Sequence, residues 1–294
     1  MKIHSLGYVR LESTVTSQWR GFAEDVLGMH ADDGPDDSLR LRMDERPARI
    51  MIVPGHQDKV AAVGLELRDQ AALNAAVAEL SAAGIAVKEG TTADAEERLV
   101  ERFVSLEDPG GNPLELFFSQ QVDGLPVSLP HGGEFVTGAL GAGHVVLPAG
   151  DMDATFDFYT QVAGFKHRDS MLVRIPNLAP IRLRFLGCNP RHHTIALTQA
   201  SSPQGMRHMM VEVDSIKTFG RAYARAREAG VLKTEIGQHS NDEVLSFYVF
   251  CPGGFEFEFG VHGRHVDENN WLTRELTNLS YWGYWPAQSS KQES

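Results

Sequence analysis

The spacing of hydrophobic residues changes from a strand-like to a helical period and back several times along the chain. Residues 17–26 and 153–162 carry apolar side chains at helical spacing, and a short apolar stretch precedes each of them. A glycine then ends the helical pattern, Gly28 in the first case and Gly164 in the second. Each segment therefore predicts a strand, a helix, a glycine stop and further strands.

The same order of elements occurs a second time within each half. The segments 64–83 and 210–229 each predict a strand that runs into a helix, and a glycine follows each helix. Both halves close with a Pro-Gly-Gly turn, beginning at Pro109 and at Pro252, and a strand after it. The pattern thus predicts modules of the order strand–helix–strand–strand–strand, two in each half.

This repetition predicts an α+β protein with two related domains. The 294 residues are enough for two domains of ordinary size. The segment 120–138 contains two prolines and a Gly-Gly pair, which is typical of a linker. We therefore expect an N-terminal domain of residues 1–134 and a C-terminal domain of residues 135–294.

The candidate chemistry lies where the two halves differ. Aligning the repeats puts Tyr8 opposite His144, Ala62 opposite His208, and Glu115 opposite Glu258. Only the second half carries two imidazoles and a carboxylate at these strand positions. If the three side chains converge, they form a 2-His-1-carboxylate site, which binds one face of a metal ion and leaves the other face open. The first half keeps only the carboxylate, so its metal site would be lost.

Glu258 is the most informative residue of the three. It lies in a strand of alternating Phe and Glu residues, where Glu256 shares its face. A buried carboxylate without a partner is energetically costly, whereas a single histidine at the start of a strand is more often structural. We expect a cation beside Glu258, and solvent or an ion pair beside Glu256.

Composition and charge exclude several classes of protein. The net charge of −12 and the pI of about 5.4 argue against binding to nucleic acid or to an anionic membrane through a basic surface. No apolar run is long enough for a transmembrane helix, and residues 1–5 lack the apolar stretch of a signal peptide. Two cysteines, Cys188 and Cys251, are too few for a disulfide scaffold. We expect a cytoplasmic protein.

Three separated blocks of the second half carry a family pattern. They are residues 189–193 with their His-His pair, residues 207–213, and residues 237–258 with the Pro-Gly-Gly turn. In this order they resemble the type I extradiol ring-cleavage dioxygenases of the vicinal oxygen chelate superfamily, and the resemblance covers nearly the whole chain. One departure is Cys251, where an acidic, amide or small residue is usual in the family.

The resemblance implies the fold, the metal and the reaction. It implies that each domain pairs its two βαβββ modules into an incomplete barrel. His144, His208 and Glu258 match the metal ligands of the family. The implied cofactor is Fe(II), with Mn(II) possible because it accepts the same ligands. The implied reaction is extradiol cleavage of a catechol by O₂, giving a 2-hydroxy-6-oxo-dienoate.

Other site residues also follow from the resemblance. His193 matches the acid–base histidine, a task suited to an imidazole because its ordinary pKa is near 6.5. His239 and Tyr248 match residues that hydrogen-bond the bound catecholate, and Asn241 and Asp242 match the substrate-binding loop after that histidine. From the residues alone, His239 could instead cap a turn, Tyr248 could be an ordinary strand aromatic, and either member of the His pair could be structural.

The blocks are most similar to those of 2,3-dihydroxybiphenyl 1,2-dioxygenases and steroid-catechol dioxygenases. They imply a biaryl or polycyclic catechol, with a steroid-derived catechol as the alternative. The segment 171–182 lies between two expected strands and could wall the pocket. Met209 and Met210 are apolar enough to line it, although core packing explains them equally well.

Two other functions fit the same scaffold. One is a glyoxalase-like isomerase, which usually draws metal ligands from both halves of its site. The other is a binding protein without catalytic activity, against which the intact His144 and His208 argue. A homo-oligomer is expected, and the aromatic run 281–285 could cover a subunit contact or pack on its own domain.

Overall fold

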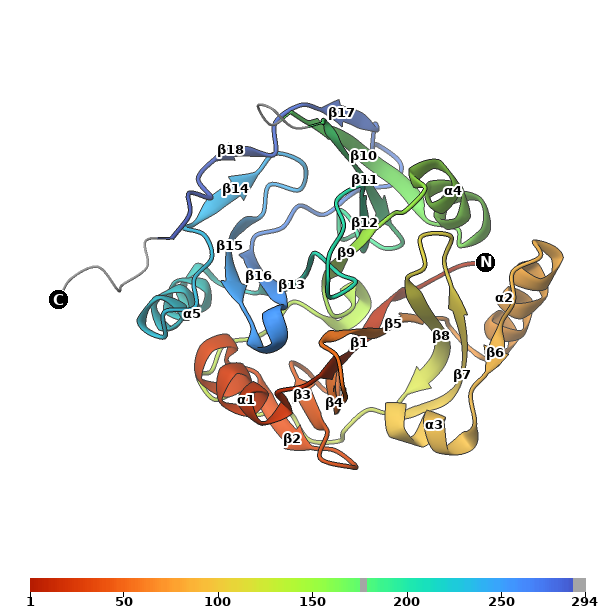
Figure 1. Ribbon diagram of the computed structural model, residues 1–294, viewed down its shortest axis with the longest axis horizontal. Coiled ribbons are helices and arrows are strands. Elements are labelled where there is room, and N and C mark those ends of the chain that lie inside the picture. The colour runs from red at the N-terminus through yellow and green to blue at the C-terminus, as the bar shows by residue number, and fades with distance from the viewer. Residues whose placement is uncertain (175–178, 288–294) are drawn as a thin grey trace.

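A computed structural model describes residues 1–174 and 179–287 and shows two curled sheets flanked by helices (Figure 1). Each sheet is built from two βαβββ modules, as the sequence repeats predict. The protein is thus an α+β protein of the expected architecture.

The first two modules form an eight-stranded sheet. Their elements are β1 (Ser5–Ser13), α1 (Thr16–Gly21), a π-helical turn (Phe22–Leu27), β2 (His30–Asp33), β3 (Leu39–Arg42), β4 (Ile50–Pro54), β5 (Lys59–Glu66), α2 (Gln70–Ala82), β6 (Lys88–Glu89), α3 (Thr92–Arg98), β7 (Val100–Glu107) and β8 (Pro113–Gln120).

The third and fourth modules, with two strands of the C-terminal tail, form a ten-stranded sheet. Their elements are β9 (His144–Pro148), α4 (Met152–Asp157), a π-helical turn (Phe158–Val162), β10 (Lys166–Val173), β11 (Ile181–Gly187), β12 (Ile195–Thr198), β13 (His208–Val213), α5 (Ile216–Glu228), β14 (Gly237–His239), β15 (Leu245–Phe250), β16 (Glu256–Val261), β17 (Arg274–Leu276) and β18 (Ser280–Trp282). Short 3₁₀ turns lie at Gly138–Leu140 and Pro252–Gly254.

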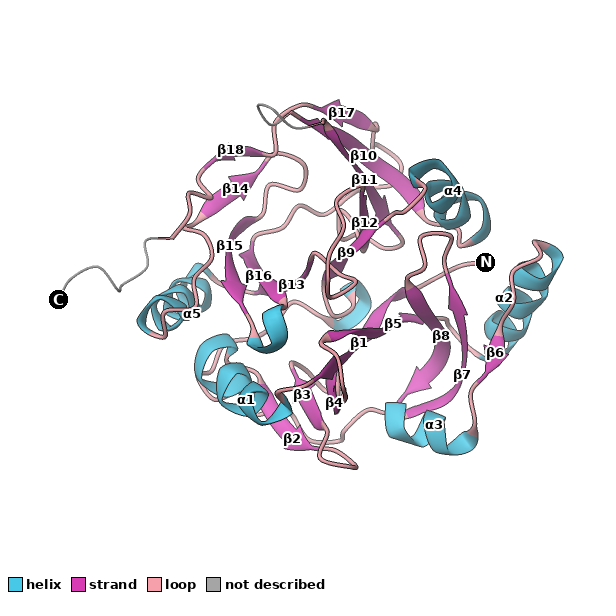
Figure 2. Ribbon diagram, viewed as in Figure 1, coloured by secondary structure: helices cyan, strands magenta, loops and turns pink. Residues whose placement is uncertain are grey.

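The two sheets share one strand order (Figure 2). The first runs β2-β3-β4-β1-β5-β8-β7-β6, and the second runs β10-β11-β12-β9-β13-β16-β15-β14 between the two tail strands. In each, the first strands of the two modules pair antiparallel at the centre, β1 with β5 and β9 with β13. The register therefore relates each residue of one half to a defined residue of the other.

The tail shows how strongly the second sheet curls. β17 pairs with β10 at one edge, and β18 pairs with β14 at the other edge. Only residues 277–279 separate these two tail strands. Because extended chain spans at most about 3.6 Å per residue, the two edges of the sheet lie within about 15 Å of each other. The sheet is an incomplete barrel, and the tail bridges its opening.

Local sequence explains the helices. Asp69 caps α2 by accepting from the backbone N–H of Ala72, and Ser215 caps α5 in the same way through Thr218. Helix α5 buries Phe219, Ala222 and Ala226 on one face. The observed bounds lie within one or two residues of the expected ranges.

The sequence reasoning missed several elements. Helix α3 and the tail strands β17 and β18 were not expected, and the ends of the helices at residues 22–27 and 158–162 are π-helical. Helix α3 begins with a capping box between Thr91 and Asp94, a local signal that was available in the sequence. No helix of the described residues is long and apolar enough to cross a membrane.

Candidate metal centre

Three neighbouring strands bring the predicted ligands together. His144 begins β9, His208 begins β13, and Glu258 lies within β16. The register places Met210 beside His144 on one side and beside Glu258 on the other. His208 lies two residues from Met210, so its side chain projects from the same face of the sheet. The convergence depends on strand pairing, which explains why the residues are far apart in the sequence.

The donor atoms of this triad lie close enough to bind one ion. The Nε2 atoms of His144 and His208 lie 3.5 and 3.2 Å from Oε2 of Glu258. Ligand atoms at right angles about 2.1 Å from a shared ion would be about 3 Å apart. The donor atoms of all three residues lie within 4.8 Å of one another. Two imidazoles and one carboxylate therefore fit a divalent transition metal with open coordination positions.

The electrostatics of the triad also favour a cation. Burial opposes ionisation of Glu258, but contacts with His144, His208 and His239 outweigh burial and hold its pKa well below the ordinary value. Burial lowers the pKa of His208, against the opposing effect of Glu258. An ionised carboxylate therefore faces His208, whose imidazole is available as a neutral ligand. Nδ1 of His144 is buried without a hydrogen-bond partner.

His193 lies against this centre. It precedes β12, which pairs with β9, and its ring centroid is 3.9 Å from that of His144. Burial and the neighbouring imidazoles of His144 and His192 hold its pKa well below the ordinary histidine value. With Asp242 and His144 it makes a second close group of donor atoms, in which Nδ1 of His193 is 3.7 Å from Oδ2 of Asp242.

His239 and Tyr248 lie together beside Glu258. Nε2 of His239 is 2.8 Å from the hydroxyl of Tyr248 and 3.4 Å from Oε1 of Glu258. Burial would lower the pKa of His239, but Glu258 outweighs it and raises that pKa to about 9. Burial and Glu258 raise the pKa of Tyr248 well above 10, so the phenol remains a donor. A metal ion would take up the charge of Glu258 and so weaken its effect on His239.

The predicted loop residues also reach the site. Asn241 and Asp242 are buried and line the same pocket. The backbone carbonyl of Asn241 accepts from Arg274, and the Asp242 carboxylate accepts from the backbone N–H of Val244. These contacts fix the turn between β14 and β15.

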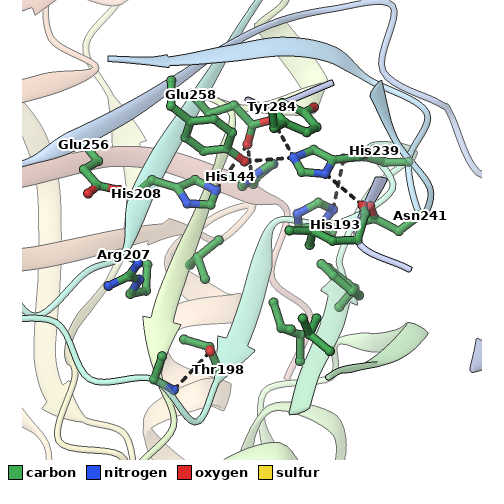
Figure 3. Close-up of a pocket in the computed structure, with 18 of the residues that line it drawn as sticks. His144, His193, Thr198, Arg207, His208, His239, Asn241, Glu256, Glu258 and Tyr284 are labelled. Atoms are coloured by element: carbon green, nitrogen blue, oxygen red, sulfur yellow. Dashed lines mark hydrogen bonds and ion pairs between the residues drawn. The ribbon is translucent and has the colours of Figure 1, made fainter. Parts of the chain in front are cut away.

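The pocket has a volume of about 370 Å³, at the small end of the range for ligand sites. Figure 3 shows His144, His208 and His239 grouped beside Glu258, with Thr198 and Arg207 at the other end of the pocket. The apolar part of the lining is formed by Val146, Val173, Ile181, Leu183, Phe185, Ala200 and Leu279. Such a cavity suits an aromatic ring with polar groups at one end.

The pocket lining decides between the open expectations for Met209 and Met210 and tests that for the segment 171–182. Met209 and Met210 do not line this pocket and belong to the buried core. The two ends of the expected segment 171–182 belong to the strands β10 and β11, and Val173 and Ile181 line the pocket as expected. Residues 175–178, including Pro176, lie outside the described residues. Glu256 pairs with Lys233 at the pocket, as one of the two expectations for it allows.

The sequence reasoning missed a contact from the tail. The ring of Tyr284 stacks on His239 with a centroid distance of 4.4 Å. The hydroxyl of Tyr284 lies 2.7 Å from Oγ of Ser246. The hydroxyl of Ser246 in turn donates to Oε1 of Glu258 at 2.5 Å. The aromatic run therefore packs on its own domain at Tyr284. No local sequence motif predicts this contact, because it depends on the pairing of β18 with β14.

The first half shows what replaces the triad. The register there places Tyr8 and Glu115 beside Gly64, in the positions that His144 and Glu258 hold around Met210. Glu115 accepts from the hydroxyl of Tyr8 at 2.6 Å and from the guanidinium of Arg98 at 2.7–2.9 Å. An arginine on α3 thus supplies the cation beside Glu115.

Comparisons with known families support this geometry. Residues 6–55 match the family described as "Dihydroxybiphenyl dioxygenase BphC D1". Residues 141–259 match the family described as "Glyoxalase/Bleomycin resistance protein/Dioxygenase superfamily".

Relatives match over nearly the full chain. An iron-dependent extradiol dioxygenase of Rhodococcus jostii (strain RHA1) is 43% identical, over 97% of both chains. A biphenyl-2,3-diol 1,2-dioxygenase of Metapseudomonas furukawaii is 34% identical over 97% of this chain and 94% of its own. Among solved structures, a catechol 2,3-dioxygenase superposes with a TM-score of 0.91 at 32% identity, covering 98% of this chain and 96% of that one.

Proposed function

Because the chain belongs to the extradiol dioxygenase family, we propose that it is an Fe(II)-dependent enzyme that opens a catechol ring beside its two hydroxyl groups, using O₂. The observation that carries the proposal is the convergence of His144, His208 and Glu258 at one end of an aromatic-sized pocket. The product would be a 2-hydroxy-6-oxo-dienoate. A biaryl or polycyclic catechol is the proposed substrate, supported by the apolar wall beyond the triad.

The metal has one task in this proposal. When bound by His144, His208 and Glu258, Fe(II) would supply the redox chemistry that lets a closed-shell catechol react with triplet O₂. Mn(II) accepts the same ligands. Iron is favoured because a relative of 43% identity is named iron-dependent.

The chain's own residues bind the substrate and move its protons. His193 is the proposed acid–base group, since it is neutral and lies 3.9 Å from the His144 ring, measured between centroids. His239 and Tyr248 are the proposed donors to the negative oxygen of the catecholate. Asn241 and Asp242 line the same pocket and are proposed to bind the substrate with them. The apolar side chains opposite would exclude water from the ring.

The assay follows from the proposal. Protein loaded anaerobically with Fe(II) and 2,3-dihydroxybiphenyl should turn yellow and consume O₂ when air is admitted. His208→Ala should lose iron and activity, whereas His262→Ala, on an exposed histidine, should keep both. His193→Ala should keep iron and lose turnover by about 10²-fold or more. Unchanged O₂ in the wild-type sample would reject ring cleavage and favour an isomerase or a binding protein.

A substrate series tests the preferred catechol. Values of kcat/KM for mono-, bi- and polycyclic catechols, together with a steroid-derived catechol, should rise from one ring to two. Preference for the steroid-derived compound would replace the biaryl assignment while leaving the reaction unchanged.

The proposal also covers the domains, the cellular location and the oligomeric state. We propose residues 1–134 as a domain without catalytic activity and 135–294 as the catalytic domain, supported by the Arg98–Glu115 pair in the first. A cytoplasmic location is supported by the two free cysteines. A homo-oligomer is supported by the exposed side chains of Tyr281, Trp282 and Trp285, and light scattering on the purified protein tests it.

A further inference from the structure

A chain of buried hydrogen bonds leads away from His193 on the side remote from the metal ligands. Nδ1 of His193 lies 3.1 Å from Nδ1 of His192. Nε2 of His192 lies 3.0 Å from Oδ2 of Asp169. All three residues are at most 2% exposed, so water does not substitute for these contacts. The distances make each link a hydrogen bond.

The ionised state of Asp169 sets these directions. Burial opposes its ionisation, but hydrogen bonds from His192 and Arg274 outweigh burial and lower its pKa. An ionised carboxylate only accepts, so Nε2 of His192 must carry a proton and donate it. Arg274 already balances the charge of Asp169, so the buried His192 carries only this proton, and its unprotonated Nδ1 can only accept. Nδ1 of His193 must therefore be the donor in the contact between the two histidines.

This order leaves one nitrogen of His193 unprotonated. A neutral imidazole carries one proton, and in His193 that proton is on Nδ1. Nε2 is then a lone pair, and it makes no hydrogen bond to any residue that the structure describes. The ring lines the pocket, so this nitrogen is the one available to a substrate hydroxyl.

We propose that Asp169 is a positioning residue, which acts through His192 to hold His193 in the tautomer that can accept a proton from the catechol. The inference rests on the proposed function, because it assigns a task within that reaction. In the step itself, the catechol O–H bond breaks and an Nε2–H bond forms on His193. The positive charge is then shared along the His193–His192 contact and faces the carboxylate of Asp169, which parallels the orienting role of the aspartate in a Ser-His-Asp triad.

The groups around the hydrogen bonds from His193 to Asp169 support this role of Asp169. Asp242 is the other carboxylate facing His193, and its 3.7 Å separation from Nδ1 is too long for a hydrogen bond. Asp169 is itself held by Arg274 of the tail, whose backbone N–H and Nε donate to Oδ1 at 2.9 and 3.2 Å and whose Nη2 donates to Oδ2. Trp271 packs against both His192 and Arg274. The carboxylate is therefore fixed in orientation.

Asp169→Asn is the informative substitution. The backbone N–H and Nε of Arg274 would keep the amide oxygen in the place of Oδ1, so the amide NH₂ would face Nε2 of His192 and displace Nη2 of Arg274, which donates to Oδ2 in the wild type. His192 would then accept there and donate from Nδ1, which forces His193 to carry its proton on Nε2. We expect kcat to fall by about 10²-fold or more with iron content and catechol affinity unchanged. The loss should shrink as pH approaches the pKa of the catechol, which then arrives already ionised.

Two controls separate positioning from structural damage. Arg182→Gln removes an ion pair with Glu275 of the tail and leaves the contacts of Asp169 in place, so it should retain most of kcat. Asp169→Asn added to His193→Ala should lower kcat no further, because both act through one group. An equal loss in Arg182→Gln, or an additive loss in the double variant, would overturn the proposal. If Asp169→Asn does not fold, His192→Phe serves in the same cycle with the same expectations.

A direct reading of the tautomer does not depend on turnover. In wild-type enzyme loaded with diamagnetic Zn(II), ¹⁵N NMR should show Nδ1 of His193 protonated and Nε2 unprotonated, and Asp169→Asn should reverse the two. A wild-type enzyme without ring cleavage but with this tautomer would reject the proposed function alone. Protonated Nε2 in the wild type would reject the role of Asp169 even in an active enzyme.

Discussion

At the scale of single residues, Glu115 and Glu258 show two ways to stabilise the same buried carboxylate. They hold equivalent register positions, and both are at most 4% exposed. Glu115 faces the guanidinium of Arg98 and the hydroxyl of Tyr8, whereas Glu258 faces imidazoles. The guanidinium of Arg98 closes the first site, whereas the imidazole nitrogens of His144 and His208 leave the second site able to bind a metal.

The Arg98–Glu115 pair gives a stability prediction. Arg98→Leu leaves a buried carboxylate without its cation and should lower the free energy of unfolding by about 3–5 kcal/mol. Urea denaturation measures this change. Adding Glu115→Gln should recover much of the loss, because the neutral amide still accepts from Tyr8. A double variant no more stable than Arg98→Leu would contradict this account.

Asp169 gives a prediction about pH. Its pKa in the folded protein is lowered, so its stabilising contribution is fully present above the ordinary aspartate value of about 3.9 and decreases as pH falls through the lower folded pKa. Wild-type protein should therefore exceed Asp169→Asn in urea midpoint at pH 6, and the difference should shrink below about pH 4. A difference that stays constant from pH 6 to pH 3 would show that charge is not its source.

At the scale of elements, the pairing of the tail strand β18 places the nearby Tyr284 where it is linked through Ser246 to the metal ligand Glu258. The hydroxyl of Tyr284 contacts Ser246 on β15, and Ser246 donates to Glu258 on β16. Groups that hydrogen-bond a ligating carboxylate fix its orientation and raise metal affinity. The contact therefore links the C-terminal tail to the metal site.

Metal affinity tests this link. Ser246→Ala should raise the Kd for Fe(II) by about 10-fold, within the range for lost partners of metal ligands. Tyr284→Phe keeps the stacking on His239 and loses only the hydroxyl, so its effect should be smaller. Anaerobic metal titration of the two variants measures both. Equal affinities in all three proteins would remove Ser246 from the site.

Sequence periodicity predicted the modules, and the mismatch between repeats predicted the triad. Both signals are local or arise by comparing one half with the other, as with His144 against Tyr8. The tail strands could not be predicted in this way, since β17 and β18 have no counterpart in the first half and only three residues each. The roles of Tyr284 and Asp169 could not be predicted either, because they depend on contacts that form only after the sheet curls.

At the scale of the whole molecule, the two halves share a core. The indole of Trp19 on α1 lies 5.9 and 6.1 Å from the rings of Phe255 and Phe257 of the second half, measured between centroids. Its Nε1 donates to Ser13. Phe257 directly precedes Glu258, so the first half supports the strand that carries the carboxylate.

Trp19 therefore tests the dependence of one half on the other. Trp19→Ala should lower the free energy of unfolding by about 3–5 kcal/mol, as for other large core aromatics. Trp285→Ala is the matched control, because that side chain is 63% exposed, and it should change stability by less than about 0.5 kcal/mol. Thermal unfolding followed by circular dichroism measures both. A small effect at Trp19 would indicate that the halves are stable independently.

The tail that bridges the second sheet also determines what its borders offer to other molecules. Long, unpaired strand edges are templates for intermolecular sheet growth and aggregation. Here β17 covers β10 and β18 covers β14, and each new border is only three residues long. The first sheet ends in the charged pair Lys88–Glu89 of β6 and in β2, which carries two aspartates. A segment that contributes a tyrosine to the metal site thereby also protects the folded chain from self-association through its strands.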